Sequence, residues 1–202
     1  MPVLNAVLNV IMAGAALVGA AVAVLGLKTW RSQLKGKTEW ELARRLLREV
    51  YRLRAQFSRV RNPVMLGGEM QAAYEAAGLD PEGGAPTSDG RTNGLVYQRR
   101  WEGLQGTMAD LDVEALEAEV LWGKDAQEAL APLRKCASEL FAALHMYLRY
   151  SGKNPTWTPS HEKRQEIEAK VWEIRGDDDI LSDQIDEAIS RIEKFLRRHL
   201  EL

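Results

Sequence analysis

The feature that most constrains this chain is a long uncharged segment at its start, followed at once by a basic one. Residues 1–27 contain no charged side chain, and residues 28–61 hold eleven Lys and Arg against three Glu. Within residues 3–27 only Asn5 and Asn9 interrupt the apolar run. A helix of this length, at ~1.5 Å rise per residue, covers a hydrocarbon core of ~30 Å. We therefore expect residues 1–27 to form a transmembrane anchor.

A cleaved signal peptide and a buried core helix are the alternatives to an anchor. A signal peptide has basic residues before its apolar part and a small-residue cleavage site after it. Here no Lys or Arg precedes the run, and Leu25-Gly26-Leu27 is a poor cleavage site. The sequence therefore favours the anchor.

The cations behind the anchor predict its orientation. Four of them follow the apolar run closely and none precedes it: Lys28, Arg31, Lys35 and Lys37. Cytoplasmic flanks of membrane helices are enriched in Lys and Arg. We expect a bacterial inner-membrane protein with its N-terminus outside and the bulk of the chain in the cytoplasm. A single cysteine, Cys136, suits that reducing compartment.

Small residues repeat within the anchor. Ala15, Gly19 and Ala23 are spaced by four and would lie on one helical face, where they would let a second helix approach closely. We expect transmembrane helix packing there, although such residues are also common in membrane helices that do not associate.

The basic juxtamembrane segment, residues 28–63, should contain a separate helix. Gly36 is a plausible joint, and Thr38 with Glu41 has the spacing of a capping box. Apolar residues then recur at helical spacing up to the stop at Asn62-Pro63. They are Leu42, Leu46, Val50, Leu53, Phe57 and Val60.

The arginines of this helix divide into two groups. Arg44, Arg48 and Arg52 should face away from the apolar stripe, where we expect contact with anionic lipid headgroups at the membrane surface. Nucleic acid is a poorer partner, because the rest of the chain is acidic. Arg54 and Arg61 instead share the side of Val50 and Phe57. We expect structural ion pairing for both, with Glu69 as one candidate partner, and a ligand-binding role as the alternative.

The remainder reads as a connection and a helical domain. Residues 64–94 include a stretch rich in Gly, Pro, Ser and Asp and predict a flexible connection. Residues 95–202 show four helical patterns and no sustained strand alternation. The predicted fold is all-α: an N-terminal transmembrane helix, then an antiparallel helical bundle in which the acidic residues 95–202 pack on the 38–61 helix.

Three stretches carry a family resemblance: VRNP, EAEVLWG and AISRIEKFLRRHL. With them the chain resembles uncharacterised bacterial single-pass membrane proteins that have a helical cytoplasmic domain. The resemblance implies that architecture over most of the chain, but it implies no activity and no functional residue.

No motif in the sequence carries specific chemistry. His161, Glu162 and Glu166 lack the HExxH order of a zinc site, and no phosphate-binding glycine loop or nucleophile elbow is present. We therefore expect a non-enzymatic module without cofactor or metal that binds membrane lipid and a protein partner or a second copy of itself. The alternatives are a membrane-active effector that oligomerises through its transmembrane helix, and a membrane-tethered enzyme.

Overall fold

A computed structural model describes residues 2–79, 90–152, 155–174 and 179–200, and within them the side chains of residues 2–11, 13 and 16 are not described. The described chain is all-α and contains no strand. Six helices follow in order: α1 (Pro2–Arg61), α2 (Gly67–Ala76), α3 (Gly90–Trp122), α4 (Lys124–Ser151), α5 (His161–Val171) and α6 (Ile180–Leu200).

The C-terminal half of α1 is the central element of the bundle. It packs chiefly on α3 and α6, while α4 contacts α3, α5 and α6. All six apolar positions predicted for this part of α1 are buried, from Leu42 to Val60. They meet a core that includes Leu104 and Leu111 of α3, with Leu140 of α4. The 3.6-residue period of the sequence therefore identifies the buried face of α1 correctly.

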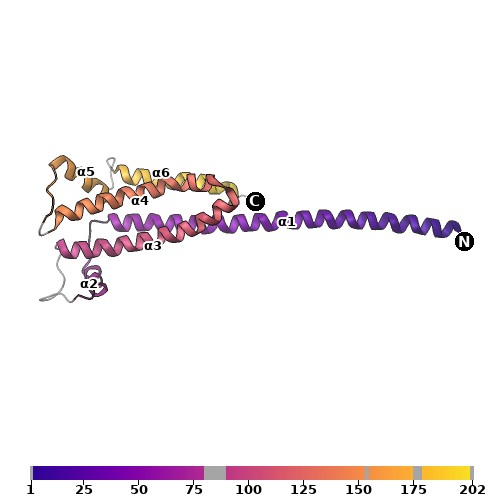
Figure 1. Cartoon of the computed structure of the whole chain (residues 1–202), viewed down its shortest axis with the longest axis horizontal. Helices are drawn as coiled ribbons and strands as arrows, with labels where there is room; N and C mark the ends of the chain where they lie inside the picture. Colours follow the sequence, from indigo (N-terminus) through magenta and orange to yellow (C-terminus); the bar gives the residue numbers. More distant parts are fainter. Residues whose placement is uncertain (1, 80–89, 153–154, 175–178, 201–202) are drawn as a thin grey trace.

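The N-terminal half of α1 projects from the bundle. Figure 1 shows this half of α1 running away from the other helices, with the N-terminus at its far end and the C-terminus beside the point where α1 joins the bundle. We call residues 12–34 the arm. Its large apolar side chains, from Met12 to Leu34, are exposed. The expected joint at Gly36 is wrong, because α1 continues through it as one helix.

The expected capping box is also absent. Thr38 lies inside α1 and its hydroxyl donates a hydrogen bond to the carbonyl of Leu34, as helical threonines do. Thr38 lies four positions before Leu42, the first buried residue of the apolar pattern. It is therefore an internal residue of α1 and not the start of a helix. The predicted boundary between an anchor and a juxtamembrane helix corresponds to no change in backbone structure.

The predicted transmembrane helix has a helical backbone, but its membrane-spanning character is not supported by the described side chains. Among those residues no helix combines the length and the apolar character that crossing a membrane requires. The side chains of residues 3–11, 13 and 16, which form much of the predicted span, lie outside the described set.

The predicted connection, residues 64–94, is partly helical. Helix α2 occupies Gly67–Ala76, and α3 already begins at Gly90. Helix α3 also runs unbroken through Gly103 and Gly106, and α4 accommodates Pro132 in its interior. Tertiary packing on α1 and α6 outweighs these local helix-weakening residues.

Candidate functional site

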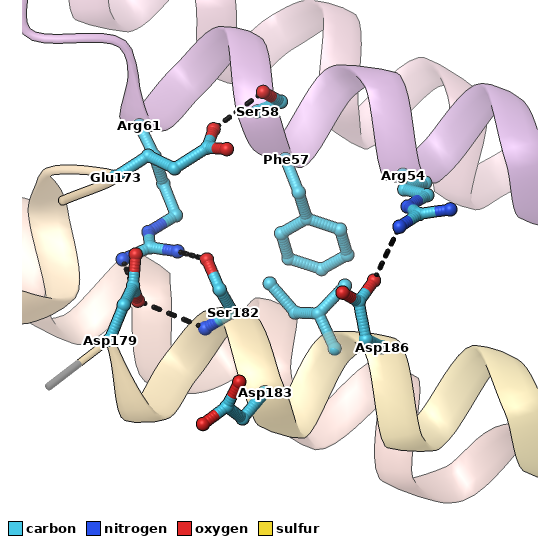
Figure 2. Close-up of a pocket in the computed structure, with 10 residues that line it drawn as sticks. Arg54, Phe57, Ser58, Arg61, Glu173, Asp179, Ser182, Asp183 and Asp186 are labelled. Atoms are coloured by element: carbon cyan, nitrogen blue, oxygen red, sulfur yellow. Dashed lines mark hydrogen bonds and ion pairs between the residues drawn. The ribbon is translucent and has the colours of Figure 1, made fainter. Parts of the chain in front are cut away.

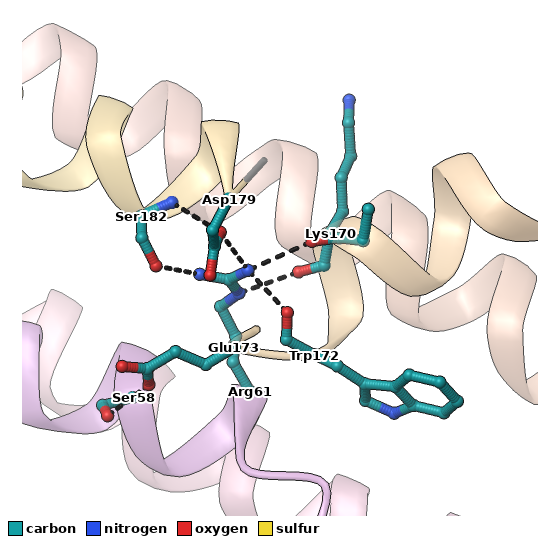
Figure 3. Close-up of polar contacts among 8 residues, drawn as sticks. Ser58, Arg61, Lys170, Trp172, Glu173, Asp179 and Ser182 are labelled. Carbon is teal, nitrogen blue, oxygen red and sulfur yellow. Dashed lines mark hydrogen bonds and ion pairs between the residues drawn. The ribbon is translucent and has the colours of Figure 1, made fainter. Parts of the chain in front are cut away.

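Arg61, the last residue of α1, lies at the most heavily bonded polar point of the described bundle. Its side chain is 1% exposed. Its Nε donates to the carbonyl of Lys170 at 2.9 Å, and its Nη2 donates to the carbonyl of Trp172 at 2.8 Å. Nη1 donates to Ser182 Oγ at 2.6 Å. Figure 3 shows these groups converging on the guanidinium from the end of α5 and the start of α6.

Asp179 is the carboxylate that balances this buried charge. It is 4% exposed, and its Oδ1 accepts from Arg61 Nη2 at 2.7 Å. The same oxygen accepts from the backbone N–H of Ser182 at 3.0 Å, so Asp179 also caps α6. Burial alone would raise the pKa of Asp179, but the hydrogen bonds from Arg61 and Ser182 outweigh it and the pKa is lowered. The two aspartates before it in the sequence, Asp177 and Asp178, lie outside the described residues.

A polar cleft of about 480 Å³ opens beside this network, between α1 and α6. Arg54 on its rim pairs with Asp186 at 2.9 Å, although both side chains are more than half exposed. Ser58 Oγ donates to Glu173 Oε2 across the cleft at 2.5 Å. Figure 2 shows these pairs spanning the gap, with Phe57 between them. Each pair joins α1 to the segment that contains α5 and α6.

The described side chains that line the cleft include two ion or hydrogen-bonded pairs, Arg54 with Asp186 and Ser58 with Glu173. Among the described residues that line it there is no histidine or cysteine, so neither Ser58 nor Ser182 has a described histidine base beside it. Within the described residues no group of three His, Cys, Asp or Glu side chains is arranged to hold a metal ion. The pairs Arg54–Asp186 and Arg61–Asp179 join the end of α1 to α6 and the residue just before it.

Arg54 and Arg61 both lie on the side of α1 that faces α6, and their partners are Asp186 and Asp179. Glu69, the expected candidate, contacts neither arginine. It instead receives two hydrogen bonds from Arg100, at 2.8 and 2.6 Å. Arg100 was not singled out in the sequence, and its position three residues from Tyr97 and four from Val96, on the apolar face of α3, is the signal that indicates burial.

The arginines expected to form an outward basic face are divided by the structure. Arg52 pairs with Glu49 at 2.7 Å and with Asp110 of α3 at 3.4 Å. Arg44 lies over the ring of Trp40, and Arg48 is exposed. The four cations nearest the apolar segment are exposed on the helix surface, and two of them pair one turn along α1 with glutamates. They are Lys28, Arg31, Lys35 and Lys37.

The small residues of the arm are uncovered in the part of the chain that the structure describes. Ala15, Gly19 and Ala23 are exposed, and a Cβ built on Gly19 meets no atom within 4 Å. The expected helix packing at these positions would therefore require a second chain.

An exposed apolar stripe on α3 is the feature that sequence reasoning missed. Leu116 and Val120 are large apolar residues four positions apart on α3, yet they are 63% and 84% exposed. With Ala109 and Val113 they line the outer side of α3, which we call the α3 stripe. The sequence does indicate this stripe, because α3 has two apolar faces. Leu104, Leu111 and Ala115 form the buried face, so the second face is left without a described partner helix.

Comparison with known proteins adds no assignment. The chain matches no protein-family model, no curated protein and no solved structure.

Proposed function

We propose that this protein is a non-enzymatic, membrane-anchored interaction module, with its helical bundle in the bacterial cytoplasm and its N-terminus outside. The observation that carries the proposal is the uncovered arm of α1. Side chains such as Leu17, Val22 and Leu25 are each more than 60% exposed. Contiguous exposed apolar surface of this kind is typical of segments that meet lipid or another protein. Insertion into a bilayer would cover all sides of the arm at once.

The order of residues along the arm supports the same proposal. Trp30 is 57% exposed just after the uncharged segment, where interfacial aromatic residues are enriched. Because α1 is continuous, Lys28 to Lys37 would lie within roughly 15 Å of the end of the apolar segment, at ~1.5 Å per residue. That range suits contact with lipid headgroups.

The continuous helix revises the expected lipid contacts of the later arginines. If α1 stands upright, Arg44 lies about 25 Å beyond Leu27, and Arg52 about 37 Å beyond it. These distances exceed the Debye length of ~10 Å at 0.1 M salt. Direct headgroup binding is therefore proposed for Lys28, Arg31, Lys35 and Lys37, and no longer for Arg44, Arg48 and Arg52.

Deletion of residues 3–27 tests the anchor. The full chain should remain with membranes after a high-salt wash, and the shortened chain should move to the soluble fraction with its helical signal intact by circular dichroism. The matched control is the full-length chain with Lys35 and Lys37 changed to Gln, which should stay in the membrane. Retention of the shortened chain after the wash would refute the anchor.

Orientation needs a separate measurement. A C-terminal reporter that is active only in the cytoplasm should work, and an equivalent reporter that is active only outside should not. The opposite pair of results would reverse the proposed topology while leaving the anchor in place.

A further inference from the structure

The α3 stripe has the register of a coiled-coil seam. Its four residues, Ala109, Val113, Leu116 and Val120, are separated by four, three and four positions, which is the spacing of alternating d and a sites of a heptad. Val113 is 67% exposed, and no described helix of this chain covers the stripe. An exposed seam of this length is suited to one additional helix packed along α3.

Carboxylates occupy all four positions that flank this seam. In the same heptad frame Asp110 and Glu117 fall at e sites, and Asp112 and Glu119 fall at g sites. These positions select partners in coiled coils through charge. The four α3 residues that flank the stripe are therefore all acidic, and we call them the acidic rim.

Internal contacts leave this acidic rim available. Asp110, Asp112 and Glu117 each meet one arginine, yet their side chains remain 58%, 50% and 47% exposed. Glu119 accepts a hydrogen bond from a neutral amide donor, Gln127 Nε2, at 2.9 Å. Half-exposed carboxylates can still bind a second cation from outside.

We propose that the α3 stripe binds an amphipathic helix of another protein, one that presents an apolar seam flanked by Lys or Arg. This inference rests on the proposed function, since it names the class of partner that the interaction module would bind. Apolar burial along the seam supplies affinity, and the acidic rim selects a basic partner over an acidic one.

Neither a lipid surface nor a second copy fits the stripe as well. Asp110 pairs with Arg52, and Glu117 pairs with Arg45, so the stripe runs beside a part of α1 that begins well beyond the headgroups. A second copy would repeat the same charges: parallel pairing of two α3 stripes sets Asp112 of one copy against Glu117 of the other. Like charges at these sites oppose association.

Two synthetic helical peptides test the proposal with the full chain in neutral phosphatidylcholine nanodiscs. Both carry Leu and Val at a and d; one has Lys at every e and g site and the other has Glu. Fluorescence anisotropy should show the Lys peptide binding roughly tenfold or more tightly than the Glu peptide, with the preference shrinking as salt rises. Equal binding of the two peptides, or binding of neither, would overturn the proposal.

Variants locate the binding on α3. The double change Leu116→Ser and Val120→Ser should weaken binding of the Lys peptide roughly tenfold or more, because two anchors are lost. Val64→Ser with Leu66→Ser, which alters equally exposed apolar residues elsewhere, should not weaken it. Glu119→Lys should reduce the preference for the Lys peptide. Binding unchanged by the α3 variants would contradict the assigned surface.

Sedimentation tests whether a second copy of the chain, and not a basic partner helix, covers the α3 stripe. If the wild-type chain self-associates in nanodiscs or detergent and the α3 double variant does not, a second copy covers the stripe and the proposed basic partner is wrong. Failure of membrane attachment would instead refute the proposed function, and the peptide measurements would not change that result.

Discussion

At the scale of single residues, burial decides what each ion pair is worth. Arg61 and Asp179 are withdrawn from water and share their hydrogen-bonding groups with the backbone, whereas Arg54 and Asp186 remain in contact with solvent. Loss of one member of a buried pair leaves an uncompensated charge, while exposed pairs are screened. The two arginines, which the sequence treats alike, should therefore differ in stability effect.

Arg61→Ala should lower the free energy of unfolding by about 3–5 kcal/mol, because Asp179 would keep its burial and lose its cation. Arg54→Ala should cost at most about 1 kcal/mol. Denaturant unfolding of both variants, followed by circular dichroism, measures the difference. Equal losses would mean that the network around Arg61 adds nothing beyond an exposed pair.

Acid should weaken the bundle through two carboxylates, Glu69 and Asp179, that accept hydrogen bonds from buried arginines. The hydrogen bonds from Arg100 lower the pKa of Glu69, against the effect of burial, and Arg61 with Ser182 lowers the pKa of Asp179. A folded-state pKa below the unfolded value, roughly 3.9 for Asp and 4.3 for Glu, gives stability that is present above that value. This stability is lost as the pH falls through the lower folded-state pKa.

We therefore expect little change from these groups between pH 7 and 5, and a steep loss below about pH 4. Asp179→Asn should be less stable at pH 7 and lose less stability on acidification, since one of the two linked protons is removed. Melting temperatures at a series of pH values provide the measurement. An unchanged acid slope in Asp179→Asn would exclude this carboxylate as a source.

At the scale of elements, the sequence predicts the buried faces of helices better than it predicts where helices begin and end. The buried positions of α1 follow from apolar periodicity alone, as Leu46 and Leu53 show. The joint at Gly36 fails because one glycine costs only about 1 kcal/mol in a helix, which packing of the following turns outweighs. The partners of Arg54 and Arg61 were not predictable, since they depend on where α5 and α6 return to α1.

The turn between α3 and α4 depends on one glycine. Gly123 has φ of 72° and ψ of −159°, a region that is essentially restricted to glycine. Gly123→Ala should cost about 1–3 kcal/mol in the free energy of unfolding. Gly106, inside α3 with open space around it, is the matched control.

Gly106→Ala should stabilise the chain by roughly 0.5–1 kcal/mol, because alanine loses less backbone entropy in a helix. Thermal melts of the two variants, compared with the unaltered chain, should therefore shift in opposite directions. A melting temperature of Gly123→Ala that does not fall would indicate that the Gly123 turn relaxes readily, and one of Gly106→Ala that does not rise would contradict the entropy argument.

At the scale of the whole molecule, the bundle is tied together at both of its ends. The Arg61 network joins the end of α1 to α5 and α6, and at the other end His199 of α6 stacks on Trp122 of α3 at 4.1 Å and lies 3.4 Å from Glu39. The part of α1 from Glu39 to Arg61 is therefore held along its length. The exposed arm is the same rigid element, continued beyond the last of these contacts.

A helix that runs without interruption from a bilayer into a bundle fixes the distance between the two. Under the proposed function it would set the height of the α3 stripe at roughly 20–40 Å above the hydrocarbon, given ~1.5 Å per residue. A flexible linker would give instead a broad distribution of heights, because its reach grows only as the square root of its length. Energy transfer from a dye on the bundle to a headgroup dye would detect the difference.

Inserting four alanines after Gln33 should raise the bundle by about 6 Å and lower the transfer efficiency. Replacing residues 31–36 by Gly and Ser should broaden the distances while leaving the melting temperature of the bundle unchanged. In the unaltered chain, a partner helix would have to present its basic seam at one fixed distance from the membrane surface. Proteins that carry such a seam closer to the lipid would not reach the α3 stripe.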